Sequence, residues 1–140
     1  MLRSMGNNLH SQDLVKESFT QAIIDREAEF ATGLPTSGLS VAIPHTDVEH
    51  VNRKTISVAT LKDPVDFGIM GGGPDEKTPV KVVFLLAMNE SNDQLSLLQQ
   101  LMQIFQDEET LLRLDNEKNK SNLRQLLAGK LSLDLKGGEV

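Results

Sequence analysis

The 140-residue sequence contains no cysteine, no tryptophan and no tyrosine, and only five phenylalanines. Without cysteine the chain cannot form a disulfide, a thiol nucleophile or a cysteine-ligated zinc site, and it is compatible with a reducing cytoplasm. Basic residues number 14 against 20 acidic ones, which leaves a net charge of −6. Nucleic-acid binding needs a basic face and usually aromatic stacking platforms, so the composition argues against it.

Long apolar runs are also missing. The longest wholly apolar run is Val82–Met88, seven residues, whereas a helix that crosses a bilayer needs about 20. The first ten residues contain no apolar segment of the kind found in secretory signals. We therefore expect no membrane insertion and a cytoplasmic protein, and the length predicts a single domain over residues 1–140.

Helical and strand patterns alternate along the chain. Apolar residues at three- and four-residue intervals predict one helix over residues 11–30, and the Thr, Ser, Gly and Pro residues of 31–38 predict a loop. Three apolar or β-branched runs predict strands, and a fourth predicts a short edge strand: Leu39–Ile43, Thr55–Leu61, Val80–Met88 and Val65–Gly68. The run Val80–Met88 is the most apolar, so we expect it at the centre of the sheet.

Further helices are predicted after this central strand. Ser91 precedes Gln94 by three residues, which is the spacing of a capping box, and leucines then recur at helical intervals up to Phe105. Two shorter helices are expected at Thr110–Leu114 and Ser121–Ala128. The alternation predicts an α/β fold, a mixed central sheet flanked by helices on both faces. Residues 1–10 are expected to be a trimmed start and residues 130–140 a flexible tail.

His45 is the first candidate for chemistry. It follows Pro44 directly after a predicted strand, and catalytic groups of α/β folds commonly lie on loops just beyond strand ends. A neutral imidazole is nucleophilic near pH 7, and a hydrogen bond at one ring nitrogen leaves the lone pair of the other available. A lone histidine in this position is also compatible with an ordinary surface or capping role.

Several other patterns point to chemistry less specifically. Asp47, Glu49 and His50 follow His45 closely, but the five-residue step between the histidines fits neither one strand face nor the helical spacing of a zinc motif, so we expect no metal site. Asp66-Phe67-Gly68 resembles a kinase tripeptide without the other kinase motifs. The glycines at 71–73 lack the ending of a phosphate-binding loop and predict a connector.

The segment REAEFATGLPTSGLSVAIPHT, which ends at Thr46, resembles the active-site region of the type-2 (fructose, mannitol, galactitol) enzyme IIA components of the bacterial phosphoenolpyruvate-dependent sugar phosphotransferase system. That family has an Arg-Glu pair at a helix end, a Thr-Gly loop and a strand that ends in Ala-Ile-Pro-His. The strand VVFLLAM and the helix NDQLSLLQQLMQIF extend the resemblance over residues 9–127. REAEF-x-TG, His50 and the glutamines of the late helix are most similar to the galactitol branch.

The resemblance implies that His45 accepts a phosphoryl group through Nε2 from the carrier HPr and passes it to a IIB domain. Arg26 is then the candidate for stabilising the phosphate, although it also fits a helix-terminal cation or a partner for a carboxylate. Thr32 could donate to the phosphate or stabilise its loop, and Glu27 and His50 are supporting residues. Gln94 stands where mannitol-type members have a second active-site histidine, and it cannot carry a proton charge near neutrality. The carrier role implies no metal and no organic cofactor.

Two other functions stay open from the sequence. A protein of the same fold could regulate a partner through its phosphorylation state, as in the nitrogen-related branch. A metal hydrolase built on the His, Asp and Glu residues at 45–50 would hold a stoichiometric metal ion. Neither the sugar nor the oligomeric state follows from the sequence.

Overall fold

The fold is built on strand β4 (Lys77–Ala87), whose second half is continuously apolar and fully buried. In the computed structural model, which describes residues 2–36, 39–117 and 119–130, four strands form one mixed sheet in the order β1-β2-β4-β3. β4 is parallel to β2 (Ser40–Ala42) and antiparallel to β3 (Thr55–Gly68), and β1 (Gly33–Pro35) is antiparallel to β2. The predicted central position of this strand is confirmed.

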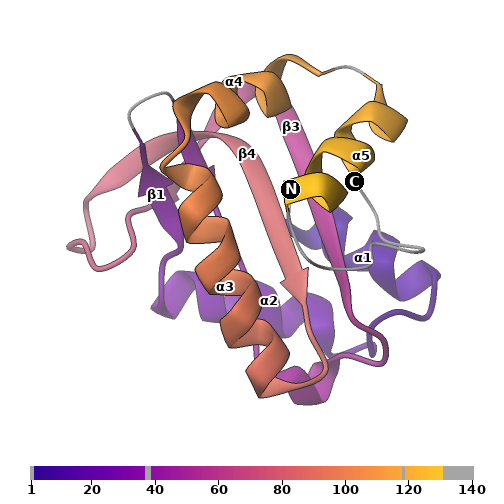
Figure 1. The fold of residues 1–140 in the computed structure, drawn as a ribbon. Coiled ribbons are helices and arrows are strands. Elements are labelled where there is room, and N and C mark those ends of the chain that lie inside the picture. Colours follow the sequence, from indigo (N-terminus) through magenta and orange to yellow (C-terminus); the bar gives the residue numbers. More distant parts are fainter. Residues whose placement is uncertain (1, 37–38, 118, 131–140) are drawn as a thin grey trace.

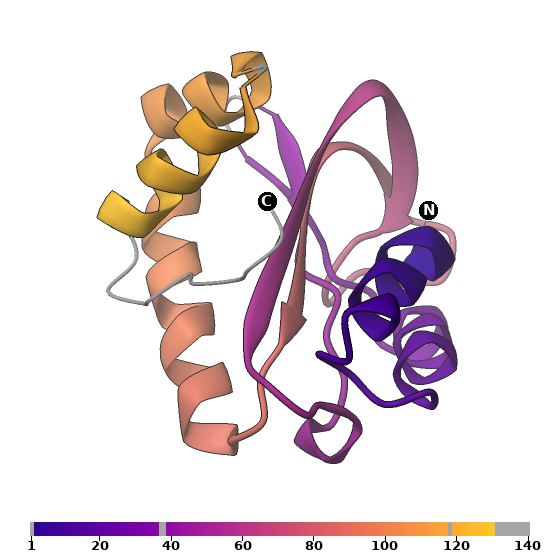
Figure 2. The same cartoon turned by 90° about the vertical axis from the view of Figure 1, so that its right-hand side faces the viewer.

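Helices cover both faces of the sheet, as predicted (Figures 1 and 2). Helices α1 (Leu2–Ser11) and α2 (Phe19–Glu29) lie on one face. Helices α3 (Ser91–Phe105), α4 (Glu108–Asn116) and α5 (Lys120–Lys130) lie on the other. A short 3-10 helix, η1 (Val48–His50), connects β2 to β3. The predicted α/β class is therefore confirmed.

Alternation along β4 divides the core between the two faces. Val82, Phe84 and Leu86 pack with α3, α4 and α5, and the ring of Phe84 lies 5.4 Å from that of Phe105. Leu85 and Ala87 point the other way and pack with apolar residues of α1 and α2. Because both faces of β4 are buried, a polar substitution on either face would remove core contacts. The same burial makes β4 a rigid base for the loops at its end.

The prediction of one helix over residues 11–30 was wrong. The structure ends α1 at Ser11 and starts α2 at Phe19, and Asp13 between them has a positive φ of 59°. Leu14 and Val15 keep the helical spacing but reach the core from this turn, where Val15 forms a bridge with Val51. Long-range packing therefore outweighs the local periodicity. Residues 2–11 form a helix that the sequence patterns did not predict.

Close packing joins α1 to α2. Gly6 is buried, and a Cβ atom at this position would lie 2.6 Å from Oγ1 of Thr20. Thr20 donates from the same hydroxyl to Asn7 at 3.2 Å. The absence of a side chain at Gly6 thus lets α1 approach α2 and present Leu9 to the core.

Three smaller expectations also need correction. Residues 33–35, expected in a loop, form β1 because they pair with β2, and the two runs expected at 55–61 and 65–68 are one strand with an irregularity between Thr60 and Val65. The capping box at Ser91 does not form: Glu90 is the N-cap and makes no side-chain bond. The predicted strand at 39–43 and the helices at 91–105, 110–114 and 121–128 are confirmed, with each end within two residues.

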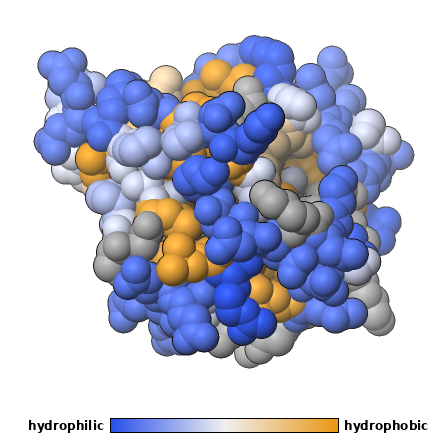
Figure 3. Space-filling model, turned by 90° about the horizontal axis from the view of Figure 1, so that it is seen from above, coloured by the Kyte–Doolittle hydropathy of each residue, from blue (hydrophilic) through white to orange (hydrophobic). Residues whose placement is uncertain are grey.

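The chain beyond Lys130, expected as a flexible tail, lies outside the described residues. None of the helices in the described part of the chain is both long and apolar enough to cross a membrane. Figure 3 views the end of the molecule near α4, away from the end of β4, and hydrophilic residues dominate it with small apolar areas between them. The opposite end, where β2 and β4 both terminate, holds the candidate site.

Candidate functional site

His45 lies at the edge of the sheet where the parallel strands β2 and β4 end. After β2 the chain continues through the buried residues Ile43 and Pro44, and the Pro44 carbonyl accepts a hydrogen bond from Leu86 of β4 at 3.0 Å. This bond extends the pairing of β2 with β4 as far as Pro44. His45, the next residue, is half-buried. Groups at the carboxyl ends of parallel strands are held rigidly and can still reach solvent.

The hydrogen bond of His45 determines which ring nitrogen is free. Nδ1 lies 2.8 Å from the main-chain carbonyl oxygen of Ile43. A carbonyl can only accept, so Nδ1 must carry the proton and donate it. In the neutral ring Nε2 is then unprotonated, and its lone pair is available for attack. This geometry fits the expectation that one ring nitrogen, Nδ1, is hydrogen-bonded and that the other, Nε2, keeps its lone pair available.

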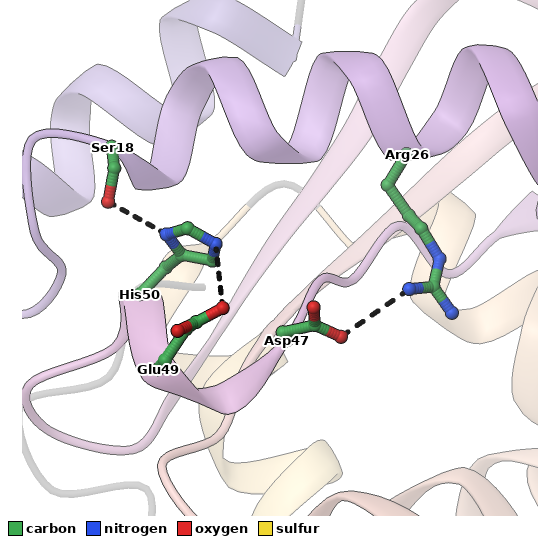
Figure 4. Close-up of polar contacts among 5 residues, drawn as sticks. All are labelled: Ser18, Arg26, Asp47, Glu49 and His50. Carbon is green, nitrogen blue, oxygen red and sulfur yellow. Dashed lines mark hydrogen bonds and ion pairs between the residues drawn. The ribbon is translucent and has the colours of Figure 1, made fainter.

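Arg26 approaches this loop from the last turn of α2. Its Nη1 lies 3.5 Å from Oδ1 of Asp47, two residues after His45, and Figure 4 shows the guanidinium extending from α2 toward that carboxylate. The guanidinium carbon also lies 4.9 Å from the ring centre of Phe30. Of the three roles that the sequence left open for Arg26, the structure shows the pairing with a carboxylate. The same contact brings a cation next to the His45 loop.

Glu27 and Thr32 form the most strongly connected polar pair of the region. Oε2 of Glu27 accepts from the Thr32 N–H at 2.8 Å, and Oε1 accepts from the Thr32 hydroxyl at 2.6 Å. Burial raises the pKa of the Glu27 carboxyl, and the side-chain and backbone hydrogen bonds from Thr32 oppose that rise. The Thr32 hydroxyl is engaged with Glu27, so its structure favours the loop-stabilising role over direct donation to phosphate.

His50 belongs to a different set of contacts from His45. Its Nδ1 lies 2.7 Å from the hydroxyl of Ser18, which precedes α2, and its Nε2 lies 3.9 Å from Glu49. Figure 4 shows this cluster at the opposite end of η1 from Asp47 and Arg26. The His50 carbonyl also accepts from Lys16 at 2.9 Å. These bonds make His50 a connection between η1 and the α1–α2 turn.

Gln94 lies in the first turn of α3, which begins just after β4 ends. Its Oε1 is buried and has no hydrogen-bond partner among the described residues, and the same is true of Oγ1 of Thr55 at the start of β3. Nearby, Lys54 pairs with Asp93 at 3.9 Å. Because α3 follows β4 directly, Gln94 lies at the same end of the sheet as His45. Its side-chain carbonyl oxygen is an unused hydrogen-bond acceptor among the described residues.

The described residues place no three His, Asp or Glu side chains together in a cluster that could hold a metal ion. Sequence reasoning missed two groups of this site. The first is the Ile43 carbonyl, which no side-chain pattern can reveal. The second is the carboxylate of Asp47. Opposite charges make a pair with Arg26 possible, but the sequence does not show that the two residues lie close together.

The fold and site define an α/β domain that presents one histidine nitrogen at the end of a parallel strand pair. Residues 1–130 match the model of a protein family described as phosphoenolpyruvate-dependent sugar phosphotransferase system, EIIA 2. The chain belongs to this family of phosphotransferase components.

Relatives with described roles are similar over most of their length. The galactitol-specific EIIA component of Escherichia coli K12 is 30% identical over 123 residues, which are 86% of this chain and 81% of that protein. The ascorbate-specific EIIA component of the same strain is 30% identical over 108 residues, 76% of this chain and 66% of that protein.

Solved structures share the fold. The complex of mannitol enzyme IIA with phosphorylated enzyme IIB from Escherichia coli matches with a TM-score of 0.63 and 24% identity, over 91% of this chain and 85% of that one. The crystal structure of mannitol IIA from the same organism has a TM-score of 0.59 and covers 90% of this chain and 85% of that one, also at 24% identity.

Proposed function

We propose that this protein is a phosphocarrier of sugar or sugar-alcohol uptake: His45 accepts a phosphoryl group from phosphorylated HPr and transfers it to a IIB domain. The observation that carries the proposal is the bond from Nδ1–H of His45 to the Ile43 carbonyl, since it leaves Nε2 as the nucleophilic atom. Membership of the EIIA 2 family supports the same role.

The transfer needs no proton to move at His45. The lone pair of Nε2 attacks phosphorus, and the bond from phosphorus to the donor imidazole breaks, so the donor ring takes back that electron pair. His45 keeps its Nδ1 proton, and its ring gains positive character as the N–P bond forms. The Ile43 carbonyl then accepts a charge-assisted hydrogen bond, which is stronger than the one in the resting protein. Transfer to the IIB domain reverses these steps.

Phosphoryl transfer also requires positive charge near the equatorial oxygens. Arg26 is the proposed source, because a guanidinium can offer two donors to a phosphate. In the resting protein it pairs with Asp47, and that carboxylate is 68% exposed and free to move away. An incoming phosphoryl group with about two negative charges competes well with a single carboxylate for Arg26.

We expect Asp47→Asn to increase the phosphorylated fraction of His45 at equilibrium with phospho-HPr. The increase should be modest, up to about fivefold, because exposed ion pairs are worth at most about 1 kcal/mol. Glu49→Gln is the matched control: it removes one negative charge two residues further along the chain, but Glu49 contacts His50 instead of Arg26. An equal change in both variants, or a decrease in Asp47→Asn, would contradict competition for Arg26.

The partners are proposed on two grounds. The matched mannitol structure is a complex of IIA with phosphorylated IIB, which supports a IIB domain as the acceptor here. Two large apolar side chains near the site are more than half exposed: Leu95 (58%), next to Gln94, and Phe30 (56%), under Arg26. Apolar groups in such positions are suited to contact a docking protein.

The test is incubation of the protein with radiolabelled phosphoenolpyruvate, enzyme I and HPr. We expect one phosphate per chain that is acid-labile and base-stable, as a phosphoramidate should be. The labelled protein is then mixed with purified IIB domains of the galactitol, ascorbate and mannitol systems, and we expect the fastest transfer to the galactitol type. A wild-type chain that stays unlabelled would overturn the proposal, and labelling without transfer to any IIB domain would favour a regulatory role.

A further inference from the structure

A continuous set of hydrogen bonds leads from the Arg-Glu pair of α2 to the ring of His45. Glu27 binds both the N–H and the hydroxyl of Thr32. The Thr32 carbonyl accepts from the Ile43 N–H at 3.3 Å, and the Ile43 carbonyl accepts from His45 Nδ1 at 2.8 Å. Each residue between the two ends is held on both sides.

The burial of this path keeps it intact. Thr32 is 3% exposed and Ile43 is fully buried, so water does not replace these bonds easily. Next to Thr32, Gly33 pairs with Ala42, and a Cβ atom on Gly33 would lie 2.4 Å from the Gly68 carbonyl oxygen. The start of β1 therefore packs closely against both β2 and the end of β3, and a change in its position would be transmitted to β2.

We propose that Glu27 is a positioning residue for His45: by holding Thr32 it holds the Ile43 carbonyl in the place that keeps the proton of His45 on Nδ1. The effect of Glu27 on phosphoryl transfer rests on the proposed function, whereas its effect on the position of the His45 proton does not. Glu27 does not touch the reacting atoms, so it acts only through Thr32 and Ile43.

The path transmits position and not charge. The N–H and the C=O of Thr32 belong to different peptide units, and so do those of Ile43, so polarisation does not pass along one conjugated group. The negative charge of Glu27 is therefore not required. What matters is that two polar atoms of one side chain meet the N–H and the hydroxyl of Thr32.

This distinction makes the substitutions informative. In Glu27→Gln the amide oxygen can accept from the Thr32 N–H, and the amide nitrogen can donate to the hydroxyl, which reverses its role. In Glu27→Ala both bonds are lost. We expect Glu27→Gln to transfer phosphate within about threefold of the wild-type rate, and Glu27→Ala to be slower by roughly 10- to 100-fold, as for a misplaced reacting group.

A second measurement reads the His45 ring directly. Nitrogen-15 NMR of the imidazole at a pH where it is neutral reports the fraction with the proton on Nδ1. We expect that form to dominate in the wild type and in Glu27→Gln, and a mixture with the Nε2 form in Glu27→Ala. A role in stability alone would lower the melting temperature and leave the tautomer unchanged.

Asp107→Ala is the matched control. Asp107 binds the N–H and the hydroxyl of Thr110 at the start of α4, at 3.4 and 2.7 Å, so it repeats the contact of Glu27 with Thr32 on the other face of the sheet. We expect Asp107→Ala to lower the melting temperature without any change in the His45 tautomer or in the transfer rate per folded molecule.

The outcomes separate the two proposals. A wild-type tautomer and rate in Glu27→Ala would overturn the positioning role, and so would a Glu27→Gln variant as impaired as Glu27→Ala. Thr32→Val, which keeps its N–H and loses its hydroxyl, provides a second folded variant if Glu27→Ala does not fold, and we expect a tautomer shift in the same direction. A wild-type chain that takes no phosphate but shows the tautomer shift in these variants would overturn the carrier function and support the positioning role.

Discussion

His45→Ala is expected to take up no phosphate from phospho-HPr, a loss of at least three orders of magnitude relative to the wild type. The physical reason is that the reaction forms a bond from Nε2 to phosphorus, and no other group in the described site can replace this nitrogen as nucleophile. The measurement is the radiolabel retained on the chain after enzyme I and HPr have been equilibrated with phosphoenolpyruvate, separated by size from HPr.

The two remaining histidines of the sequence provide the comparison. His10 lies exposed in the last turn of α1, and His10→Ala should be labelled like the wild type. His50 is turned toward Ser18 and Glu49, so His50→Ala should also keep its label. Label retained in His45→Ala, or lost in His50→Ala, would assign the phosphate to another residue.

Arg26→Ala is expected to slow phosphoryl transfer to His45 by roughly 10²- to 10³-fold, the cost of removing one strong donor from developing negative charge. The guanidinium is the cation that the structure holds next to the His45 loop through Asp47. Its position is constrained by the Phe30 ring as well, so part of its ordering is complete before phosphate arrives. Quench-flow measurement of single-turnover transfer from phospho-HPr gives the rate.

Arg26→Lys distinguishes charge from geometry. Lysine keeps the positive charge but offers a point charge instead of two parallel donors, so we expect a rate between those of the wild type and Arg26→Ala. If Arg26→Ala transfers at the wild-type rate, Arg26 serves only as the partner of Asp47. Thermal unfolding of both variants checks that the ion pair, which is exposed, contributes little to stability.

The Arg26 and Glu27 predictions concern adjacent residues that act in different ways. Arg26 is expected to act on the phosphoryl group by its charge, whereas Glu27 is expected to act on the tautomer of His45 by its shape and bonding. The pair should therefore give distinct signatures: Arg26→Ala should leave the imidazole tautomer unchanged, and Glu27→Ala should shift it. The two neighbouring side chains contact different loops, Arg26 the one after β2 through Asp47 and Glu27 the one before β1 through Thr32.

Local sequence determined much of this protein. The continuous apolar run of β4 requires burial on both faces and therefore a central strand, and the leucine spacing of α3 specifies a helix with one buried side. Pro44 ends the strand before it and places His45 just beyond the sheet. These features depend on neighbouring residues and on periodicity, so they can be predicted without knowing the rest of the fold.

Only the tertiary structure decided where the first helical region breaks. The sequence positions of Leu14 and Val15 fit a continuous helix, but these two residues reach the core from a turn. The tertiary structure alone also brought Asp47 to Arg26 and the Ile43 carbonyl to the His45 ring. The Arg26–Asp47 contact depends on where α2 packs against the sheet, and the His45–Ile43 bond depends on the path that the chain takes after β2; both result from packing of the whole core. Sequence patterns identify the groups with chemical capacity, whereas packing fixes the distances at which those groups can react.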